Sequence, residues 1–332
     1  MSGTALIFGI SGQDGGFLAR HLLLQGWTVH GVSRNAELNE FQNLRILGIR
    51  DKVRVHTANP ADLRNVIQVI EAAAPDQIYN LSGQSSVGLS FDRPVETVLS
   101  NVVDTFNILE AIRALKAPVR FYNAASSECF GDTGPEGADE TTPFRPRSPY
   151  AVSKAAAFWA VANYREAYGL FAASGILFNH ESPLRPERFV TQKIVRYALR
   201  AANAAGIEPL ELGNLEIVRD WGWADEYVEA IHLIMQLDRP EDFVIATGRG
   251  ATLRDFTSEV FAAVGLDWQQ HVVSRPEFMR PSEISVSIGR PEQAAQRLQW
   301  RARTHMPEIA RRLVDAAASE LRPAQDRPRK SD

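Results

Sequence analysis

A glycine-rich turn near the start of the chain constrains the fold most strongly. The apolar run Ala5 to Phe8 is followed by three evenly spaced glycines, Gly9, Gly12 and Gly15. A helical pattern of apolar residues then runs from Phe17 to Leu23. Glycine lets such a turn be tight, and the first N–H groups of the helix are then free to bind a pyrophosphate. Strand, turn and helix together predict a dinucleotide-binding unit; the alternative is that the glycines only serve strand–helix packing.

The residues after the second apolar strand bear on which dinucleotide binds. Trp27 to Val32 predicts this strand, and Ser33, Arg34 and Asn35 follow it. An acidic residue here would accept hydrogen bonds from the ribose 2′-hydroxyl of NAD, whereas a guanidinium pairs with the 2′-phosphate of NADP. Arg34 therefore favours NADP over NAD, the alternative being an arginine that is simply solvated.

Further apolar runs alternate with helical stretches along the first half of the chain. The runs are Val53 to Thr57, Gln77 to Leu81, Val119 to Ala124 and Phe171 to Phe178, and the longest helical stretch is Pro94 to Leu115. This alternation predicts an α/β fold with a Rossmann-type, doubly wound parallel sheet. The residues that follow the strands then line one crevice: Gly9–Gly15, Arg34, Asn59, Ser82–Gln84 and Ser126–Glu128.

The chain length suggests one large domain and a smaller one. We expect residues 1–178 to form the NADP-binding domain. Residues 179–320 are expected to form mainly a smaller α/β region that binds substrate, with the chain free to cross back to the sheet. Residues 321–332 are rich in charged residues and proline and predict a disordered tail.

Composition and charge exclude several classes of function. The net charge of −4 argues against a nucleic-acid or anionic membrane surface, and no apolar stretch is long enough to span a membrane. Neither is an export signal expected. Cys129 is the single cysteine, so no internal disulfide forms and a reducing cytoplasm is the expected location. The histidines and this cysteine are not spaced as metal ligands, so no metal is expected.

Four polar residues at or near the fifth strand predict a catalytic site. Ser126 and Glu128 follow that strand, and Tyr150 and Lys154 lie one helical turn apart. A lysine ammonium beside a phenol favours the phenolate, so we expect a lowered pKa for Tyr150 that lets it take a proton from a sugar hydroxyl. Hydride transfer needs only the hydroxyl and the phenol, so Glu128 predicts a further proton removal from carbon beside a transient ketone. Taken alone, Tyr-x-x-x-Lys is also the pattern of a solvated helix face.

Basic side chains recur in the second half of the chain. Arg185, Lys193, Arg219 and Arg280 are accompanied by Glu283. Guanidinium groups bind diphosphates through several hydrogen bonds, so this set predicts a diphosphate substrate. Taken singly, most of these residues would be surface salt-bridge partners. Arg219 fits that alternative least well, because bulky apolar residues flank it.

Longer motifs point to a family. They are Gly9–Gly15 with Gln13-Asp14, Tyr79–Leu81 with Gln84-Ser85, Pro146–Lys154, Gly175–Pro183, Arg219–Gly222 with Asp225–Ala230, and Arg280–Glu283. With these motifs the chain resembles the GDP-mannose 4,6-dehydratases, a branch of the extended short-chain dehydrogenases, from about Leu6 to about Ala317. The glycine spacing is typical of the whole superfamily, whereas Asn179–Pro183 and Arg219–Gly222 are far more specific.

The resemblance implies a lyase that converts GDP-mannose to GDP-4-dehydro-6-deoxy-mannose with tightly bound NADP. Tyr150, assisted by Lys154, would take the O4 proton while hydride leaves C4. Ser126 would hydrogen-bond O4, and Glu128 would remove the C5 proton before water leaves C6. The implied cofactor contacts are Gly9, Ser11, Gly12, Gln13, Asp14, Gly15, Arg34, Asn59, Leu81, Ser82, Tyr150 and Lys154. The implied GDP-sugar contacts are Gln84, Ser85, Asn179, Lys193, Arg219, Arg280 and Glu283.

The resemblance also implies a homodimer or homotetramer, in which residues 35–43 can lie at a subunit contact. Two other functions stay open. A reductase or epimerase of a 4-keto GDP-sugar would not need Glu128, and a nucleotide-binding protein could lack catalysis altogether. The last alternative is motivated by departures from the family pattern, namely Asn59 in place of an aspartate, Asn35 in place of an arginine, and Leu184 to Arg188 where a glycine is usual.

Overall fold

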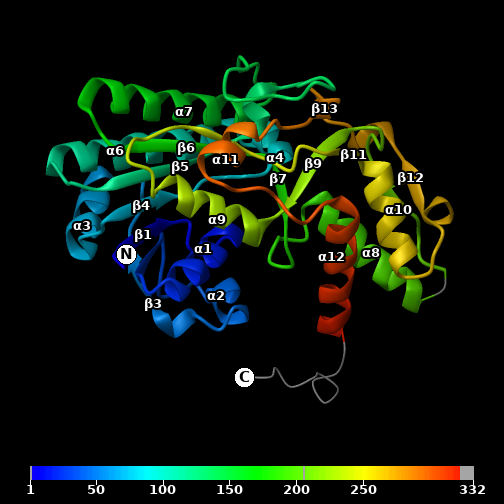
Figure 1. Cartoon of the computed structure of the whole chain (residues 1–332). Coiled ribbons are helices and arrows are strands. Elements are labelled where there is room, and N and C mark those ends of the chain that lie inside the picture. Colours follow the sequence, from blue (N-terminus) through cyan, green and yellow to red (C-terminus); the bar gives the residue numbers. More distant parts are fainter. Residues whose placement is uncertain (1, 205, 322–332) are drawn as a thin grey trace.

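A seven-stranded sheet forms the centre of the protein (Figure 1). The computed structural model describes residues 2–204 and 206–321. All strands of this sheet are parallel and stand in the order β10-β6-β5-β4-β1-β2-β3. They are β1 Thr4–Phe8, β2 Thr28–Ser33, β3 Val53–Thr57, β4 Gln77–Asn80, β5 Arg120–Ser126, β6 Ala172–Leu177 and β10 Phe243–Ile245. The predicted Rossmann-type, doubly wound α/β fold is confirmed.

Helices cover both faces of this sheet because its strands bury side chains on both faces. In β1, Ala5 and Ile7 join one core with α1 and α9, whereas Leu6 and Phe8 join another core with α3, α6 and α7. The helices are α1 Gln13–Leu24, α2 Gln42–Ile46, α3 Leu63–Ala73, α4 Val87–Asp92, α5 Pro94–Val98, α6 Asp104–Leu115, α7 Pro149–Tyr168, α8 Val190–Asn203, α9 Ala224–Ile234, α10 Leu253–Ala263, α11 Glu292–Arg297 and α12 Met306–Leu321.

The predicted helical stretch from Pro94 to Leu115 is continuous but not uniform. A π-helical turn, η2 (Leu99–Val103), joins α5 to α6. Ser100 and Asn101 in this turn bond the loop after β4: the Ser100 Oγ accepts from Gln84 N at 3.2 Å, and Asn101 Nδ2 donates to Gln84 O at 3.2 Å. The extra residue of the π turn therefore aims polar side chains at the carboxyl edge of the sheet.

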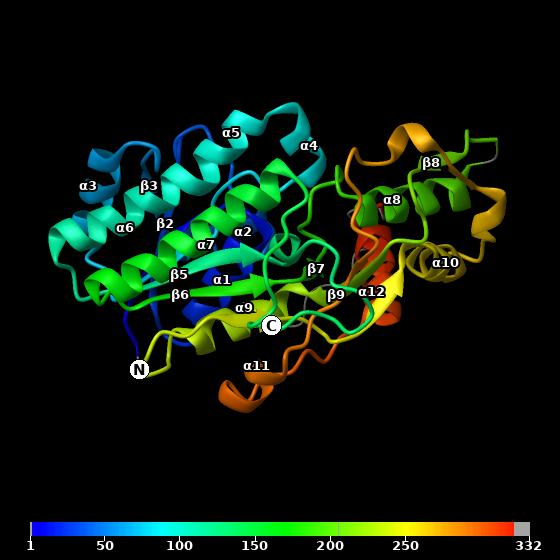
Figure 2. The same ribbon diagram turned by 90° about the horizontal axis from the view of Figure 1, so that it is seen from above.

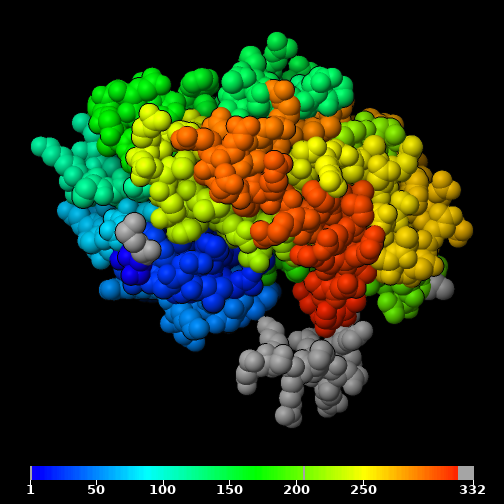
Figure 3. Space-filling model, viewed as in Figure 1, coloured from blue at the N-terminus to red at the C-terminus, as the bar shows by residue number. Residues whose placement is uncertain are grey.

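A second, smaller region lies beside this edge. Its central strand β9 (Val218–Trp223) pairs with β7, β11 and β13, and β8 pairs with β12. These strands are β7 Asn179–Glu181, β8 Leu210–Leu212, β11 Gly250–Thr252, β12 Val272–Ser274 and β13 Val286–Ser287. Helices α8, α10 and α12 share an apolar core with β8 and β9. Figures 2 and 3 show the yellow α10 region at the opposite side of the molecule from the blue N-terminal elements, with the red α12 between them.

The chain returns to the large sheet after it has entered the smaller region. Helix α9 packs against α1, and β10 then pairs with β6 as the edge strand. The 3₁₀ turns are η1 Arg50–Lys52, η3 Ser127–Phe130, η4 Trp268–Gln270 and η5 Pro276–Phe278. No helix in the described ranges is long and apolar enough to cross a membrane. The predicted tail 321–332 lies outside the described residues, except that Leu321 is the last residue of α12.

A carboxylate at the start of β10 joins three elements, which yields a test of this packing. Asp242 accepts two hydrogen bonds from the Arg165 guanidinium of α7, at 3.0 and 2.7 Å, and one from Ser174 N of β6 at 2.7 Å. Both side chains are mostly buried. We expect Asp242→Asn to lower the free energy of unfolding in urea by ~2 kcal/mol, because it leaves a buried guanidinium unpaired.

The matched control is Glu96→Gln, which removes the exposed pair between Arg93 and Glu96. That variant should lower the same free energy by less than ~0.5 kcal/mol, because solvent screens exposed ion pairs. Equal losses in the two variants would show that the Asp242 contacts do not hold β10 in place.

Candidate active site

The turn between β1 and α1 requires glycine at two positions. Gly9 adopts φ +86°, and a Cβ there would lie 2.6 Å from the carbonyl oxygen of Leu81. A Cβ on Gly15 would lie 2.3 Å from the carbonyl oxygen of Gly9. No side chain caps the N-terminus of α1. The close approach of the backbone and the uncapped helix fit the pyrophosphate of a dinucleotide.

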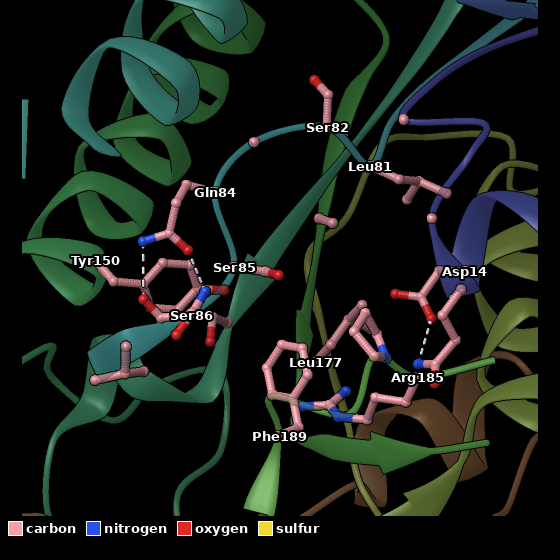
Figure 4. A pocket seen from close by; sticks show the side chains of 18 of the residues that line it. Asp14, Leu81, Ser82, Gln84, Ser85, Ser86, Tyr150, Leu177, Arg185 and Phe189 are labelled. Carbon is pink, nitrogen blue, oxygen red and sulfur yellow. Dashed lines mark hydrogen bonds between the residues drawn. The ribbon is translucent and has the colours of Figure 1, made fainter. Parts of the chain in front are cut away.

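This turn lines a cavity of about 1300 Å³ at the carboxyl edge of the sheet, which also reaches β2 and the smaller region. Most of the predicted site residues line it, and Figure 4 shows a part of its wall. They are Gly9, Ser11, Gly12, Gln13, Asp14, Gly15, Arg34, Leu81, Ser82, Gln84, Ser85, Ser126, Glu128, Tyr150, Lys154, Asn179, Arg219 and Arg280.

Three predicted site residues do not line the cavity. The side chain of Asn59 turns back to accept a hydrogen bond from Ala61 N at 3.3 Å. Lys193 donates to Glu211 O at 2.9 Å, and its ammonium lies 5.2 Å from the centre of the Phe278 ring. Glu283 lies behind the lining, 3.7 Å from Arg219. Lys193 and Glu283 therefore contact residues of the wall and do not form it.

The four predicted catalytic residues come together at the end of β5. Ser126 ends this strand and accepts a hydrogen bond from Glu128 N at 3.3 Å. Ser148 caps α7, with its hydroxyl accepting from Ala151 N at 3.1 Å, which places Tyr150 in the first turn of the helix. Lys154 follows one turn later. The side chains of Ser126, Tyr150 and Lys154 are all buried.

The expected lowering of the Tyr150 pKa by Lys154 is wrong. Burial raises the pKa of Tyr150, and a hydrogen bond with Ser126 offsets only part of this rise. The Lys154 ammonium lies 6.0 Å from the centre of the phenol ring and donates to the carbonyl oxygen of Ala124 at 2.9 Å. Burial also lowers the pKa of Lys154 to about 8. Loss of solvation, which spacing along a helix does not reveal, thus dominates the pKa of Tyr150.

Glu128 faces the cavity from the 3₁₀ turn η3. Its side chain is 13% exposed, and its Oε1 lies 3.9 Å from the Arg280 guanidinium. Arg219, from β9, is buried on the same side, and no group in the described part of the chain accepts a hydrogen bond from its Nη2. A carboxylate, a phenol and two guanidinium groups therefore share one wall, and a buried donor is left for a ligand.

A buried ion pair joins the phosphate-binding turn to the segment after β6. Asp14 Oδ2 lies 3.0 Å from His180 Nε2, and the other ring nitrogen lies 2.7 Å from Phe178 O. Burial would raise the pKa of Asp14 and lower that of His180, but their mutual attraction lowers the former and raises the latter overall. Ser182 adds a hydrogen bond to Gln13 at 2.7 Å. These contacts fix the two walls of the cavity relative to each other.

Arg185, one of the basic residues expected to suit a diphosphate, lines this cavity, whereas sequence reasoning did not place Arg188 or Asp104 there. Arg185 donates to His180 O at 3.0 Å and lies 4.0 Å from the centre of the Phe189 ring, both of which line the cavity (Figure 4). Arg188 also lines it. The signal was the density of arginine after Asn179–Pro183, which was set aside as a departure from a family pattern. Asp104, from the start of α6, is another lining residue without a sequence signal.

The residues present offer no evident metal centre. Across the described ranges 2–204 and 206–321, no three His, Cys, Asp or Glu side chains are placed to hold one ion. Cys129 is buried, and burial raises the pKa of its thiol to about 12.

Comparison with known proteins gives a consistent result. The family model described as GDP-mannose 4,6 dehydratase matches residues 6–313. GDP-mannose 4,6 dehydratase 2 of Arabidopsis thaliana is 41% identical, covering 94% of this chain and 86% of its own length. GDP-mannose 4,6-dehydratase of Sinorhizobium fredii is 40% identical, covering 96% of this chain and 97% of its own length. The human GDP-mannose 4,6 dehydratase is 39% identical, covering 96% of this chain and 92% of its own length.

Solved structures share the architecture. UDP-glucose 4-epimerase of Thermus thermophilus, in complex with NAD, superposes with a TM-score of 0.83 at 25% identity and covers 94% of this chain and 98% of its own. dTDP-glucose 4,6-dehydratase of Streptomyces venezuelae, with NAD and TYD bound, superposes with a TM-score of 0.85 at 21% identity. It covers 95% of this chain and 97% of its own. The second likeness concerns the fold alone. Nucleotide-sugar enzymes that hold a nicotinamide dinucleotide are thus built on this architecture.

The Asp14–His180 pair predicts a pH-dependent stability. A histidine with a raised pKa stabilises the fold fully below its unfolded-state pKa, and this contribution is lost as the pH rises through its folded-state pKa. We expect Asp14→Asn to lower the free energy of unfolding by about 1–3 kcal/mol, and by more at about pH 5.5 than at about pH 8.5, because the buried imidazolium then lacks a partner. Urea unfolding at the two pH values measures this difference.

The control removes the titrating ring. In a His180→Asn background, the larger loss caused by Asp14→Asn at about pH 5.5 should disappear. A single Asp14→Asn variant whose loss is independent of pH would show that the two side chains do not form an ion pair.

Proposed function

The chain belongs to the GDP-mannose 4,6-dehydratase family, and we propose that it catalyses the reaction for which the family is named. The substrate is GDP-mannose and the product is GDP-4-dehydro-6-deoxy-mannose, formed by loss of one water. The observation that carries this proposal is the carboxylate of Glu128, which faces the same cavity as Tyr150 and Ser126. A 4-epimerase or reductase needs the phenol and the hydroxyl but no second base.

When bound, a nicotinamide dinucleotide supplies the redox chemistry for oxidation at C4 and for reduction at C6. Its pyrophosphate fits the turn from Gly9 to Gly15. The chain supplies the proton transfers. Tyr150 receives the proton of the C4 hydroxyl, and Ser126 holds that oxygen through a hydrogen bond. Lys154, with a pKa of about 8, is charged at neutral pH and stabilises the phenolate when it forms.

Glu128 carries the elimination. Once C4 is a ketone, the proton on C5 is acidic, and the carboxylate removes it. The C6–O bond then breaks, and the same carboxyl group returns its proton to the leaving hydroxyl, so that water departs. The Arg280 guanidinium lies 3.9 Å from this carboxylate, on the side of the cavity formed by the smaller region.

The two buried or half-buried arginines of the smaller region suit the GDP part of the substrate. Arg219 and Arg280 line the cavity, and the Nη2 of Arg219, which makes no hydrogen bond within the described residues, is a donor for a phosphate oxygen. Gln84, Ser85 and Asn179 line the cavity and complete the proposed substrate contacts. Lys193 and Glu283 act from behind, through Phe278 and Arg219 respectively.

For the cofactor we propose NADP in preference to NAD. Arg34 follows β2, lines the cavity and is exposed, so its guanidinium is available to a 2′-phosphate. The other proposed contacts on the dinucleotide are the turn Gly9–Gly15, Leu81, Ser82, Tyr150 and Lys154. We leave Asn59 out of this set, because its side chain bonds its own loop.

The decisive experiment is to incubate the purified protein with a panel of nucleoside-diphosphate hexoses and to seek a product lighter by one water. We expect this product from GDP-mannose, together with the alkali-induced absorbance of a 4-keto sugar and no net consumption of NADPH. Net NADPH oxidation would instead identify a reductase, and a product of unchanged mass an epimerase.

Glu128→Gln should lower the rate of water loss by about 10²–10⁴-fold, because the amide cannot take the C5 proton. Dinucleotide binding should be unchanged, since Glu128 is not among the proposed cofactor contacts. A variant that kept full turnover would rule out this residue as the base and would leave the elimination without one.

We also propose that the protein is a homodimer. Large apolar side chains are exposed along α5, η2 and α7, which lie next to one another over the sheet (Figure 2). Val95 is 71% exposed, Val152 51% and Trp159 62%, and Leu99 and Phe106 extend the same strip. A contiguous exposed apolar strip on neighbouring helices is typical of a protein interface. The same strip on a second copy of the chain is equally apolar, so the two strips can pack against each other.

Trp159→Glu should therefore convert the dimer to a monomer, because it places a charge in the middle of the apolar strip. Light scattering after gel filtration measures the mass. The matched control is Leu24→Glu at the end of α1, where an equally exposed apolar side chain lies outside the strip. An unchanged mass for Trp159→Glu, or the same change for both variants, would place the subunit contact elsewhere.

A further inference from the structure

The end of the cavity next to β2 and β3 contains a buried carboxylate. Asp104 lines the cavity there together with Arg34, Ala58 and Pro60. Asp104 is only 8% exposed. Within the described part of the chain, its carboxylate makes no hydrogen bond and no ion pair. The sequence around β2 predicted NADP because no acidic residue follows that strand. The fold supplies one from a different helix.

Contacts on either side fix the position of Asp104. It is the first residue after the π-helical turn η2, which shifts the register of the helix. The next residue, Thr105, accepts a hydrogen bond from Asn80 Nδ2 at 3.1 Å, at the end of β4. One turn on, Asn107 donates to Pro60 O at 2.8 Å, just beyond β3. Asp104 is therefore held between the ends of two strands of the sheet.

Arg34 is the charged group whose field reaches this carboxylate. Burial raises the pKa of Asp104 to about 6, and the positive charge of Arg34 acts in the opposite direction. Glu40, from the loop after β2, and Glu96, from α5, are among the other carboxylates that line the cavity. The position after β2 is where the adenosine ribose is read in a Rossmann fold. Arg34 and Asp104 thus present opposite charges to one part of the ligand.

We propose that Asp104 sets the selectivity between NAD and NADP by opposing Arg34. The ionised carboxylate accepts a hydrogen bond from a ribose 2′-hydroxyl, which favours NAD. It repels a 2′-phosphate and offsets part of the attraction of Arg34, which weakens NADP. The inference rests on the proposed function only in that the ligand is a nicotinamide dinucleotide.

A competition assay tests this role without activity. The full-length protein is equilibrated with equal concentrations of NAD and NADP at about pH 8 and gel-filtered, and the bound nucleotides are released and quantified by chromatography. We expect Asp104→Asn to shift the bound ratio about tenfold toward NADP. Asp104→Ser is measured in parallel, so that the bound ratio can still be measured in one variant if the other misfolds. A shift below about threefold, or one toward NAD, overturns the proposal.

Glu96→Gln is the matched control, since it removes a negative charge from the same cavity. Its bound ratio should stay within about twofold of the wild-type ratio. A shift as large as that of Asp104→Asn would show that total charge, and not Asp104, governs selectivity, and would also overturn the proposal.

A second pH value supplies an independent readout. At about pH 5 the difference between the wild type and Asp104→Asn should shrink, because Asp104 then gains a proton and both proteins carry an uncharged group. Titration of the 2′-phosphate is common to both proteins and cancels in this comparison. A difference that does not shrink contradicts the role of the ionised carboxylate.

The two proposals about the cofactor fail separately. The wild-type ratio alone decides whether NADP is preferred, as proposed above for Arg34. The change caused by Asp104→Asn decides the role of Asp104, whichever nucleotide the wild type prefers.

Discussion

Parallel pairing of the strands decides where the functional groups of this chain lie. Since every strand of the large sheet points the same way, the loops after β1, β2, β4, β5 and β6 all open at one edge. Residues distant in sequence, such as Asp14 and His180, thereby come within 3.0 Å of each other. The smaller region then needs only to cover this edge to form a deep cavity, and its arginines face the carboxylate of Glu128.

Much of this arrangement follows from the sequence. Glycine spacing and alternating apolar runs predicted the sheet, and the residues after each strand predicted the crevice, because strand direction alone fixes both. The direction of side chains in loops was less predictable: the Asn59 side chain bonds its own turn, and Arg188 lines the cavity although no pattern marked it as a site residue. Asp104 escaped notice for a related reason, since its approach to Arg34 depends on a π-helical turn that periodicity does not reveal.

Electrostatics was the least predictable property of the site. Neighbours along a helix are readable from spacing, but the loss of solvation depends on everything that surrounds a group. Tyr150 illustrates this, because burial outweighs the effect of nearby charge on its pKa.

The return of the chain to the large sheet has a consequence for how the molecule folds. Strand β10 and helix α9 come from the second half of the sequence. Nevertheless, β10 forms an edge of the seven-stranded sheet, and α9 packs beside α1 on one of its faces. A polypeptide cut after Phe178 would leave β6 with an unpaired edge and α1 without its neighbour, so it would be prone to self-association. The two regions are interleaved, and contacts of high sequence separation make their assembly one slow, cooperative event. Ribosomal synthesis must therefore pass residue 245 before the dinucleotide-binding layer has all its strands.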